Sequence, residues 1–177
     1  MKTNRFFESF GECPALDKDF LDKEIDLVRS LDNRPIIITA SGELSSWISE
    51  AKRADILGTT LYRIVWNKYL GNLRYPFPPV FYQKRADLIK RFFGVQKVIV
   101  VELAVEPWGQ TLLYELPLEE QLKSMNLEEF KKTIQYAKET GFEEVYLWGA
   151  EWWYWLKTAQ DDKLIWDEAK ELWRNSL

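Results

Sequence analysis

Short, continuous apolar runs alternate with longer amphipathic segments along this chain. The runs are rich in β-branched residues, which is typical of strands buried on both faces of a parallel sheet. The predicted strands cover residues 35–40, 55–61, 97–102 and 144–148. Apolar residues at helical spacing predict helices over residues 17–31, 44–52, 81–93, 127–140 and 165–173. This alternation predicts a single α/β domain over residues 1–177, with parallel strands and right-handed crossovers.

Four strand–helix repeats fit two architectures. An open doubly wound sheet normally binds a nucleotide through a glycine-rich first turn. Here Ser41-Gly42-Glu43 follows the first strand and places a carboxylate where an anion would lie. The other architecture is half of a TIM-type (β/α)₈ barrel. Half a barrel has two unpaired edge strands, so completion of the barrel by homodimerisation is a natural hypothesis.

Two long segments follow predicted strands and read as loops. They cover residues 66–79 and 104–117. In parallel α/β folds the carboxyl ends of the strands and the loops that follow them carry the functional site. Functional side chains are therefore expected at these strand ends.

Composition narrows the class of protein. Hydrophobic residues make up 46% and charged residues 29% of the chain, the balance of a soluble globular protein. The net charge of −4 argues against a nucleic-acid partner, and the basic cluster over residues 84–91 reads as a solvated helix face. No membrane-length apolar run, no signal peptide and a single cysteine, Cys13, together predict a cytoplasmic location.

The absence of histidine from the sequence restricts the chemistry further. It excludes Ser-His-Asp catalysis and histidine metal sites, and the single cysteine excludes thiolate zinc sites. The possible general acids and bases are therefore Asp, Glu, Lys or Tyr, and we expect no metal or cofactor.

The segment Val98-Ile-Val-Val-Glu102-Leu-Ala-Val-Glu106-Pro-Trp108-Gly is the strongest local signal. A buried strand runs directly into Glu102, and Glu106 and an aromatic loop follow. The segment resembles the seventh strand of clan A glycoside hydrolases, in particular bacterial cellulase- or β-xylanase-like barrels. Other segments resemble family elements in the same order, namely residues 10–14 (loop after strand four), 41–44 (end of strand five), 58–63 (strand six) and 146–153 (strand eight). By this resemblance the chain corresponds to barrel units four or five to eight.

The resemblance implies retaining hydrolysis of a β-linked polysaccharide such as xylan or glucan. It assigns the nucleophile position to Glu102, a hydrogen bond to that carboxylate to Tyr62, and the floor under the sugar ring to Trp148. Three further tryptophans are candidates for flanking subsites: Trp66, Trp108 and Trp152. Four polar residues near strand ends could bind sugar hydroxyls, although a structural role stays open for the glutamates: Glu43, Arg63, Glu106 and Glu151.

The general acid/base is where this sequence departs from the family. The family has an Asn-Glu motif at the end of strand four; here Asn4 falls near the asparagine and Arg5 takes the place of the glutamate. A looser register puts Glu8 there instead. An arginine is a poor proton donor because its pKa lies far above neutral. The alternative function is therefore a non-catalytic carbohydrate- or protein-binding module, or a self-assembling barrel fragment.

The nine tryptophans need to be divided between core and site. At the last strand we expect Trp148 and Trp152 at the cleft, and Trp153 and Trp155 in the core. Helical tryptophans with apolar neighbours are expected in the core, because large aromatic side chains dominate burial. They are Trp47, Trp166 and Trp173.

Overall fold

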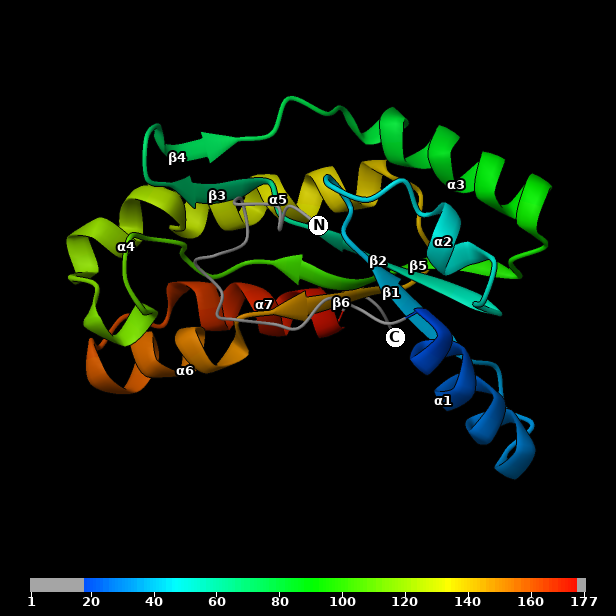
Figure 1. The fold of residues 1–177 in the computed structure, drawn as a ribbon. Coiled ribbons are helices and arrows are strands. Elements are labelled where there is room, and N and C mark those ends of the chain that lie inside the picture. The colour runs from blue at the N-terminus through cyan, green and yellow to red at the C-terminus, as the bar shows by residue number, and fades with distance from the viewer. Residues whose placement is uncertain (1–17, 175–177) are drawn as a thin grey trace. The chain divides into compact units, whose positions relative to one another are not determined.

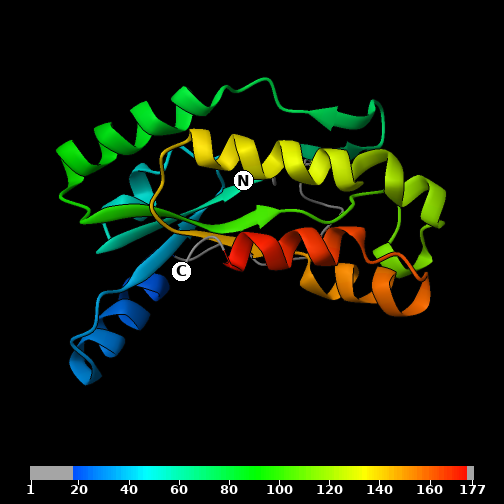
Figure 2. The ribbon, with the colours of Figure 1, turned by 180° about the vertical axis from the view of Figure 1, so that it is seen from behind.

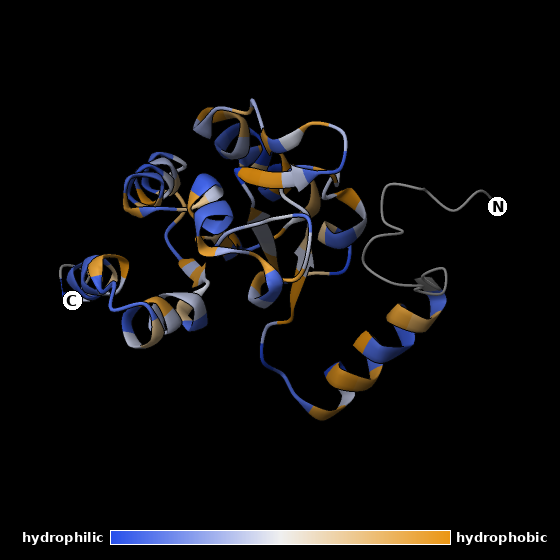
Figure 3. Ribbon diagram, turned by 90° about the vertical axis from the view of Figure 1, so that its left-hand side faces the viewer, coloured by the Kyte–Doolittle hydropathy of each residue, from blue (hydrophilic) through white to orange (hydrophobic). Residues whose placement is uncertain are grey.

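The computed structural model describes residues 18–174, and the expectations for Arg5, Glu8 and Cys13 lie outside that range. The chain divides into two units, residues 1–36 and 37–177. The described element of the first unit is α1 (Lys18–Leu31), in which hydrophobic and charged positions alternate with the helical repeat (Figure 3). Within residues 18–174, no helix combines the length and the apolar character needed to cross a bilayer.

The second unit is built on a four-stranded parallel sheet, as the sequence predicts (Figure 1). Its strands are β1 (Ile37–Ala40), β2 (Ile56–Leu61), β5 (Lys97–Ala104) and β6 (Val145–Trp148). They lie side by side in the order in which they occur along the chain. A doubly wound sheet would reverse this order at its first strand. Right-handed crossovers between consecutive neighbours instead place the connecting helices on one face of the sheet.

Each strand of the sheet is followed along the chain by one or two helices. They are α2 (Ile48–Ala51), α3 (Pro79–Phe93), α4 (Leu118–Ser124), α5 (Leu127–Glu139), α6 (Ala150–Ala159) and α7 (Leu164–Arg174). Figure 2 looks onto α3, α5 and α7, with the strands behind them. The core lies between these helices and the sheet, where Leu57, Val100 and Leu103 pack with Phe130 and Ile165.

Among the described residues, the two edge strands are exposed on the other face of the sheet, which we call the open face; at its centre Ile99 of β5 is buried. In β6, Val145 and Leu147 pack against the core, whereas Tyr146 and Trp148 point away from it and are 56% and 50% exposed. In β1, Ile37 is 48% exposed in the same way. Strands of parallel sheets are ordinarily covered on both faces.

The segment predicted as a loop over residues 66–79 contains regular structure. An antiparallel hairpin follows β2, formed by β3 (Ile64–Asn67) and β4 (Gly71–Arg74). The side chain of Asn67 closes its turn by accepting hydrogen bonds from the backbone amides of Tyr69 and Leu70, at 2.9 and 3.2 Å. Strands of four residues are too short for a clear alternation of apolar and polar positions, which explains why the pattern did not indicate them.

The loop after β5 also carries short helices. A 3₁₀ turn, η2 (Leu113–Glu115), lies inside the predicted loop and leads into α4. The expectations for two tryptophans were wrong. Trp155 is 37% and Trp173 is 66% exposed, whereas Trp47, Trp153 and Trp166 lie in or against the core as predicted.

Candidate functional site

Glu102 owes its position to an irregularity in β5. Thr59 and Thr60 of β2 are aligned with Val100 and Glu102, so one residue of β5 has no counterpart. Val100 and Leu103 both point into the core, and the two residues between them do not. Strict alternation would turn Glu102 toward the helices; this bulge turns it to the open face instead. Bulges re-aim side chains in this way beside functional sites. The strand also continues to Ala104, so Glu102 is not its last residue as predicted.

Tyr62 follows directly after β2 and reaches Glu102 on the neighbouring strand. Its hydroxyl donates a hydrogen bond to Glu102 Oε2 at 2.5 Å. Burial raises the pKa of the Tyr62 hydroxyl, and the hydrogen bond and charge of Glu102 raise it further. The charges of Glu106 and Glu43 act in the same direction. Tyr62 therefore keeps its proton at neutral pH and remains a donor to the carboxylate.

Glu43 approaches the same tyrosine from the turn after β1. A Cβ on Gly42 would lie 1.9 Å from the carbonyl oxygen of Thr60, so only glycine lets this turn pass so close to β2. Glu43 Oε1 accepts hydrogen bonds from the Tyr62 backbone amide at 3.0 Å and from the Tyr82 hydroxyl at 2.9 Å. Burial raises the pKa of Glu43, although both bonds and the charge of Arg85 oppose the shift.

Glu106 is held against the last strand of the sheet. Its carboxylate accepts a hydrogen bond from Trp148 Nε1 at 2.9 Å. A Cβ on Gly149 would lie 2.7 Å from the Cβ of Glu106, and this glycine takes a φ of +126° that other residues avoid. Val105, the residue before Glu106, is also held in place, because its carbonyl accepts a hydrogen bond from Trp153 Nε1 at 2.7 Å.

Burial raises the pKa of the Glu106 carboxyl; the bond from Trp148 lowers it, and the charge of Glu151 raises it. We call Glu43, Tyr62, Glu102, Glu106 and Trp148 the strand-end site. Two of the predicted sugar-binding residues, Glu106 and Trp148, thus form one hydrogen-bonded pair in it.

Trp66 and Trp108 lie at a hollow of about 160 Å³ beside this site. The ring of Trp108 meets the ring of Tyr62 edge to face, with centroids 5.4 Å apart. Trp108 therefore lies at the hollow and also contacts Tyr62, the residue that holds Glu102. Trp66 reaches the hollow from strand β3 of the hairpin.

Three of the predicted site residues lie elsewhere. Trp152 is 3% exposed and donates to Gln121 Oε1 at 2.6 Å, so it is a core residue and not a cleft residue as predicted. The guanidinium of Arg63 turns toward α5, where it lies 4.4 Å from the ring centroid of Tyr136 and near Glu129. Glu151 is exposed in the first turn of α6.

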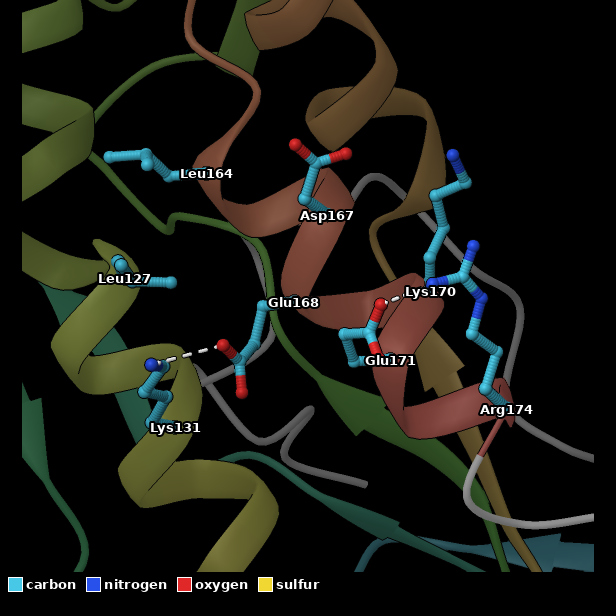
Figure 4. Close-up of a pocket in the computed structure, with 8 residues that line it drawn as sticks. All are labelled: Leu127, Lys131, Leu164, Asp167, Glu168, Lys170, Glu171 and Arg174. Atoms are coloured by element: carbon cyan, nitrogen blue, oxygen red, sulfur yellow. Dashed lines mark hydrogen bonds and ion pairs between the residues drawn. The ribbon is translucent and has the colours of Figure 1, made fainter.

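A second hollow, of about 480 Å³, lies between α5 and α7 (Figure 4). Charged side chains of both signs line most of it, and Lys131 and Glu168 form an ion pair of 3.0 Å across it. None of its residues belongs to the strand-end site. Opposite charges that already pair across the hollow leave no net charge to attract an ionic ligand.

Pattern analysis did not identify several residues that shape the strand-end site. Tyr82 and Arg85 hold the turn that carries Glu43, and both lie on a helix whose sequence shows only amphipathic spacing. Nothing in that spacing indicates which residues reach the strand ends. Within residues 18–174, no cluster of three or more Asp, Glu, His or Cys side chains is arranged to hold a metal ion.

The geometry offers one carboxylate on the open face with a phenol donor, and a second carboxylate bound to an indole beside it. Such a set can bind sugar hydroxyls and can supply a nucleophilic carboxylate oxygen. Comparison of the chain with protein-family models, curated proteins and solved structures gives no match.

Proposed function

We propose that the strand-end site binds a β-glycoside and that Glu102 acts as the nucleophile of retaining glycoside hydrolysis. The observation that carries the proposal is the 2.5 Å hydrogen bond from the Tyr62 hydroxyl to Glu102 Oε2. It orients the carboxylate from a neighbouring strand and leaves Oε1 for a reacting carbon. The bulge in β5 turns Glu102 away from the helices.

Trp148 and Glu106 support the sugar-binding part of the proposal. The indole of Trp148 is half exposed, and its Nε1 is held by Glu106, so the ring offers a fixed apolar surface. The C–H face of a pyranose packs against such a surface, and the free oxygen of Glu106 can accept from a sugar hydroxyl.

In the proposed step an oxygen of Glu102 attacks the anomeric carbon. The bond from that carbon to the leaving oxygen breaks, and its electron pair goes to the leaving oxygen, which takes up a proton unless it is a stable anion. Water then hydrolyses the glycosyl ester. The two residues that could occupy the position of the proton donor, Arg5 and Glu8, lie outside the described residues. The test therefore uses leaving groups that need no proton.

Dinitrophenyl β-glycosides with fluorine in place of the hydroxyl beside the anomeric carbon release a stable anion and form a long-lived ester. We expect the glucoside or the xyloside to release dinitrophenolate once and to add one fluorosugar mass to Glu102 in a peptide map. Glu102→Gln should abolish this label, whereas Glu151→Gln, an exposed carboxylate outside the site, should keep it. Labelling of another residue, or no label with either sugar, would refute the nucleophile role.

A non-catalytic sugar-binding role is the second candidate. The observation in its favour is that the other two carboxylates of the site already have partners. Glu43 is bonded to Tyr62 and Tyr82, and Glu106 to Trp148. Oligosaccharide binding in calorimetry, without labelling of Glu102, would favour this role over hydrolysis.

The proposal for the fold is half of a (β/α)₈ barrel completed by a second copy. Strand order that equals chain order, helices on one face and an open opposite face support it. Among the described residues no further strand pairs with β1 or β6, so the β6 edge of one copy can accept the β1 edge of the other.

A further inference from the structure

The turn after β1, which carries Glu43, is held from two sides. The backbone amide of Gly42 donates to Thr60 Oγ1 of β2 at 3.0 Å. The carbonyl of the same glycine accepts from the guanidinium of Arg85 on α3 at 2.7 Å. Both bonds involve the residue directly before Glu43, so the backbone that carries this carboxylate is fixed relative to β2 and to α3.

Trp47 ends the same turn in a strained backbone conformation. Its φ is +67°, in the left-handed region that residues other than glycine rarely adopt. Its side chain is fully buried, and its Nε1 donates to the Ser41 carbonyl at 2.9 Å. The guanidinium of Arg85 lies 4.2 Å from the centre of its ring. Such strain persists only where the surroundings over-determine it, which is common beside functional sites.

Glu43 receives its hydrogen bonds from neutral donors. Its Oε1 accepts from the Tyr62 backbone amide at 3.0 Å and from the Tyr82 hydroxyl at 2.9 Å. Arg85 acts on Glu43 through its charge, while its guanidinium donates to the Gly42 carbonyl. Hydrogen bonds to a carboxylate are roughly twice as strong as those to a neutral group. The strength of both bonds therefore depends on whether Glu43 is ionised.

Tyr62 connects Glu43 to the reacting carboxylate. Its backbone amide is bonded to Glu43, and its hydroxyl is bonded to Glu102 Oε2 at 2.5 Å. The amide bond fixes the backbone from which the phenol ring extends. The ring itself is packed edge to face against Trp108. A continuous path thus runs from the turn after β1, through the end of β2, to Glu102 on β5.

We propose that Glu43 is a positioning residue that controls the reactivity of Glu102 through Tyr62; the inference rests on the proposed function of the strand-end site. Ionised Glu43 holds the Tyr62 amide and keeps the phenol hydroxyl on Glu102 Oε2. Protonated Glu43 is a weaker acceptor, so the orientation of Glu102 loosens. The reactivity of Glu102 therefore rises with pH as Glu43 ionises, and Glu43 itself makes no contact with the sugar.

The groups that face Glu43 leave it as the one that titrates. They come from the end of β2, the segment before α3, α3 and α5, and are Tyr62, Tyr75, Tyr82, Arg85 and Tyr136. Burial, together with the charge of Glu43, raises the pKa of each of these phenols, so they stay protonated at neutral pH. The arginine stays charged throughout. Burial raises the pKa of Glu43 above its usual value.

The first test measures how fast the fluorinated dinitrophenyl glycosides label Glu102, at increasing glycoside concentration. We expect Glu43→Leu to lower the maximal rate by about tenfold and to leave the apparent dissociation constant of the glycoside unchanged. In the Tyr62→Phe background the same change should have no further effect, because the hydroxyl that it positions is gone. Glu119→Leu, at an exposed carboxylate of α4, should react at the wild-type rate. Additive losses, or weaker binding of the glycoside, would overturn the positioning role.

Glu43→Gln tests the same role without removing the acceptor oxygen, so it does not depend on the folding of the leucine variant. The ratio of the wild-type labelling rate to that of Glu43→Gln should rise between about pH 4 and about pH 7. Any titration of Glu102 is common to both proteins and cancels in the ratio. A ratio that stays constant or falls would contradict control by the ionisation of Glu43.

A measurement without substrate separates this inference from the hydrolytic function. In a chain with isotope-labelled tyrosine, the NMR resonance of the Tyr62 ring carbon that bears the hydroxyl reports on the bond to Glu102; its loss in Tyr62→Phe assigns it. Glu43→Leu should shift this resonance in the same direction as Glu102→Gln, and Glu119→Leu should leave it in place. This shift without labelling of Glu102 would support the positioning and refute only hydrolysis. Labelling of Glu102 with a resonance that ignores Glu43 would refute the positioning alone.

Discussion

Arg74 and Glu129 form a fork-shaped ion pair that joins the hairpin to helix α5. Arg74 Nη1 and Nη2 donate to the two carboxylate oxygens of Glu129, each at 2.8 Å. The Glu129 side chain is only 11% exposed, and Arg63 lies 3.5 Å from the same carboxylate. Paired geometry of this kind is among the stronger forms of charge-assisted hydrogen bonding.

We predict that Arg74→Ala lowers the free energy of unfolding by about 1–2 kcal/mol, as measured by urea denaturation. The loss stays below the roughly 3–5 kcal/mol of a fully buried pair because Arg74 is half exposed and Arg63 still compensates Glu129. Lys132→Ala, which removes an exposed pair with Glu128, should leave the stability unchanged. A double-mutant cycle of Arg74 and Glu129 without coupling would contradict the role of the pair.

The partly buried Glu43 predicts a pH-dependent contribution to stability. Its pKa in the folded chain lies above the unfolded value of about 4.3, so between these two values the folded state binds more protons. Stability conferred by this group therefore falls as pH rises through that window. Glu43→Gln cannot titrate but keeps a carbonyl acceptor, so its unfolding free energy relative to the wild type should rise with pH.

Urea denaturation at several values between about pH 4 and about pH 7 measures this difference. Tyr82→Phe removes a hydrogen bond that lowers the pKa of Glu43, and should extend the window to higher pH. A wild type that gains stability relative to Glu43→Gln as pH rises would show that the hydrogen bonds outweigh burial.

Tyr62→Phe should slow the labelling of Glu102 by about tenfold to a hundredfold, because the carboxylate loses the charge-assisted bond that orients it. The rate of dinitrophenolate release measures the effect. Tyr114→Phe, which changes a largely exposed phenol, serves as the matched control and should react at the wild-type rate. Equal rates in the two variants would mean that the bond to Tyr62 does not contribute to reactivity.

The sequence was sufficient to predict the parallel strands and most of the helices, because apolar runs and helical spacing depend on which face of each element is buried. Helices α4 and α6 were not predicted. The order of the strands in the sheet could not be predicted from these local patterns, although this order distinguishes a singly wound sheet from a doubly wound one. The hairpin was missed because its strands are short and its anchor, Arg74 to Glu129, spans 55 positions. Such long-range pairs leave no local pattern.

The candidate site was predicted in part. The pairing of Tyr62 with Glu102, expected from the resemblance, is present in the structure. The bulge that turns Glu102 to the open face was not predicted, because one extra residue in an apolar run does not change its composition. Trp148 and Trp152 are four residues apart and differ in their secondary structure. Trp148 is the last residue of a strand and is exposed, whereas Trp152 lies in the first turn of a helix and is buried.

The open face of the sheet leads to the last prediction, which concerns self-association. Tyr146 points to this face from the edge strand β6 and is 56% exposed. If two copies close an eight-stranded barrel, this side chain becomes interior, and a charge in its place would be buried without a partner. We expect light scattering coupled to size exclusion to give about twice the 21.1 kDa mass of one chain, and Tyr146→Lys to give a monomer.

Leu88→Lys is the control for this experiment, because Leu88 on α3 is 55% exposed and lies away from the open face. Its mass should match that of the wild type. A dimer that survives Tyr146→Lys would place the interface on another surface. A wild-type monomer at the highest concentration would refute closure by a second copy, since exposed strand edges pair with another chain when nothing else covers them.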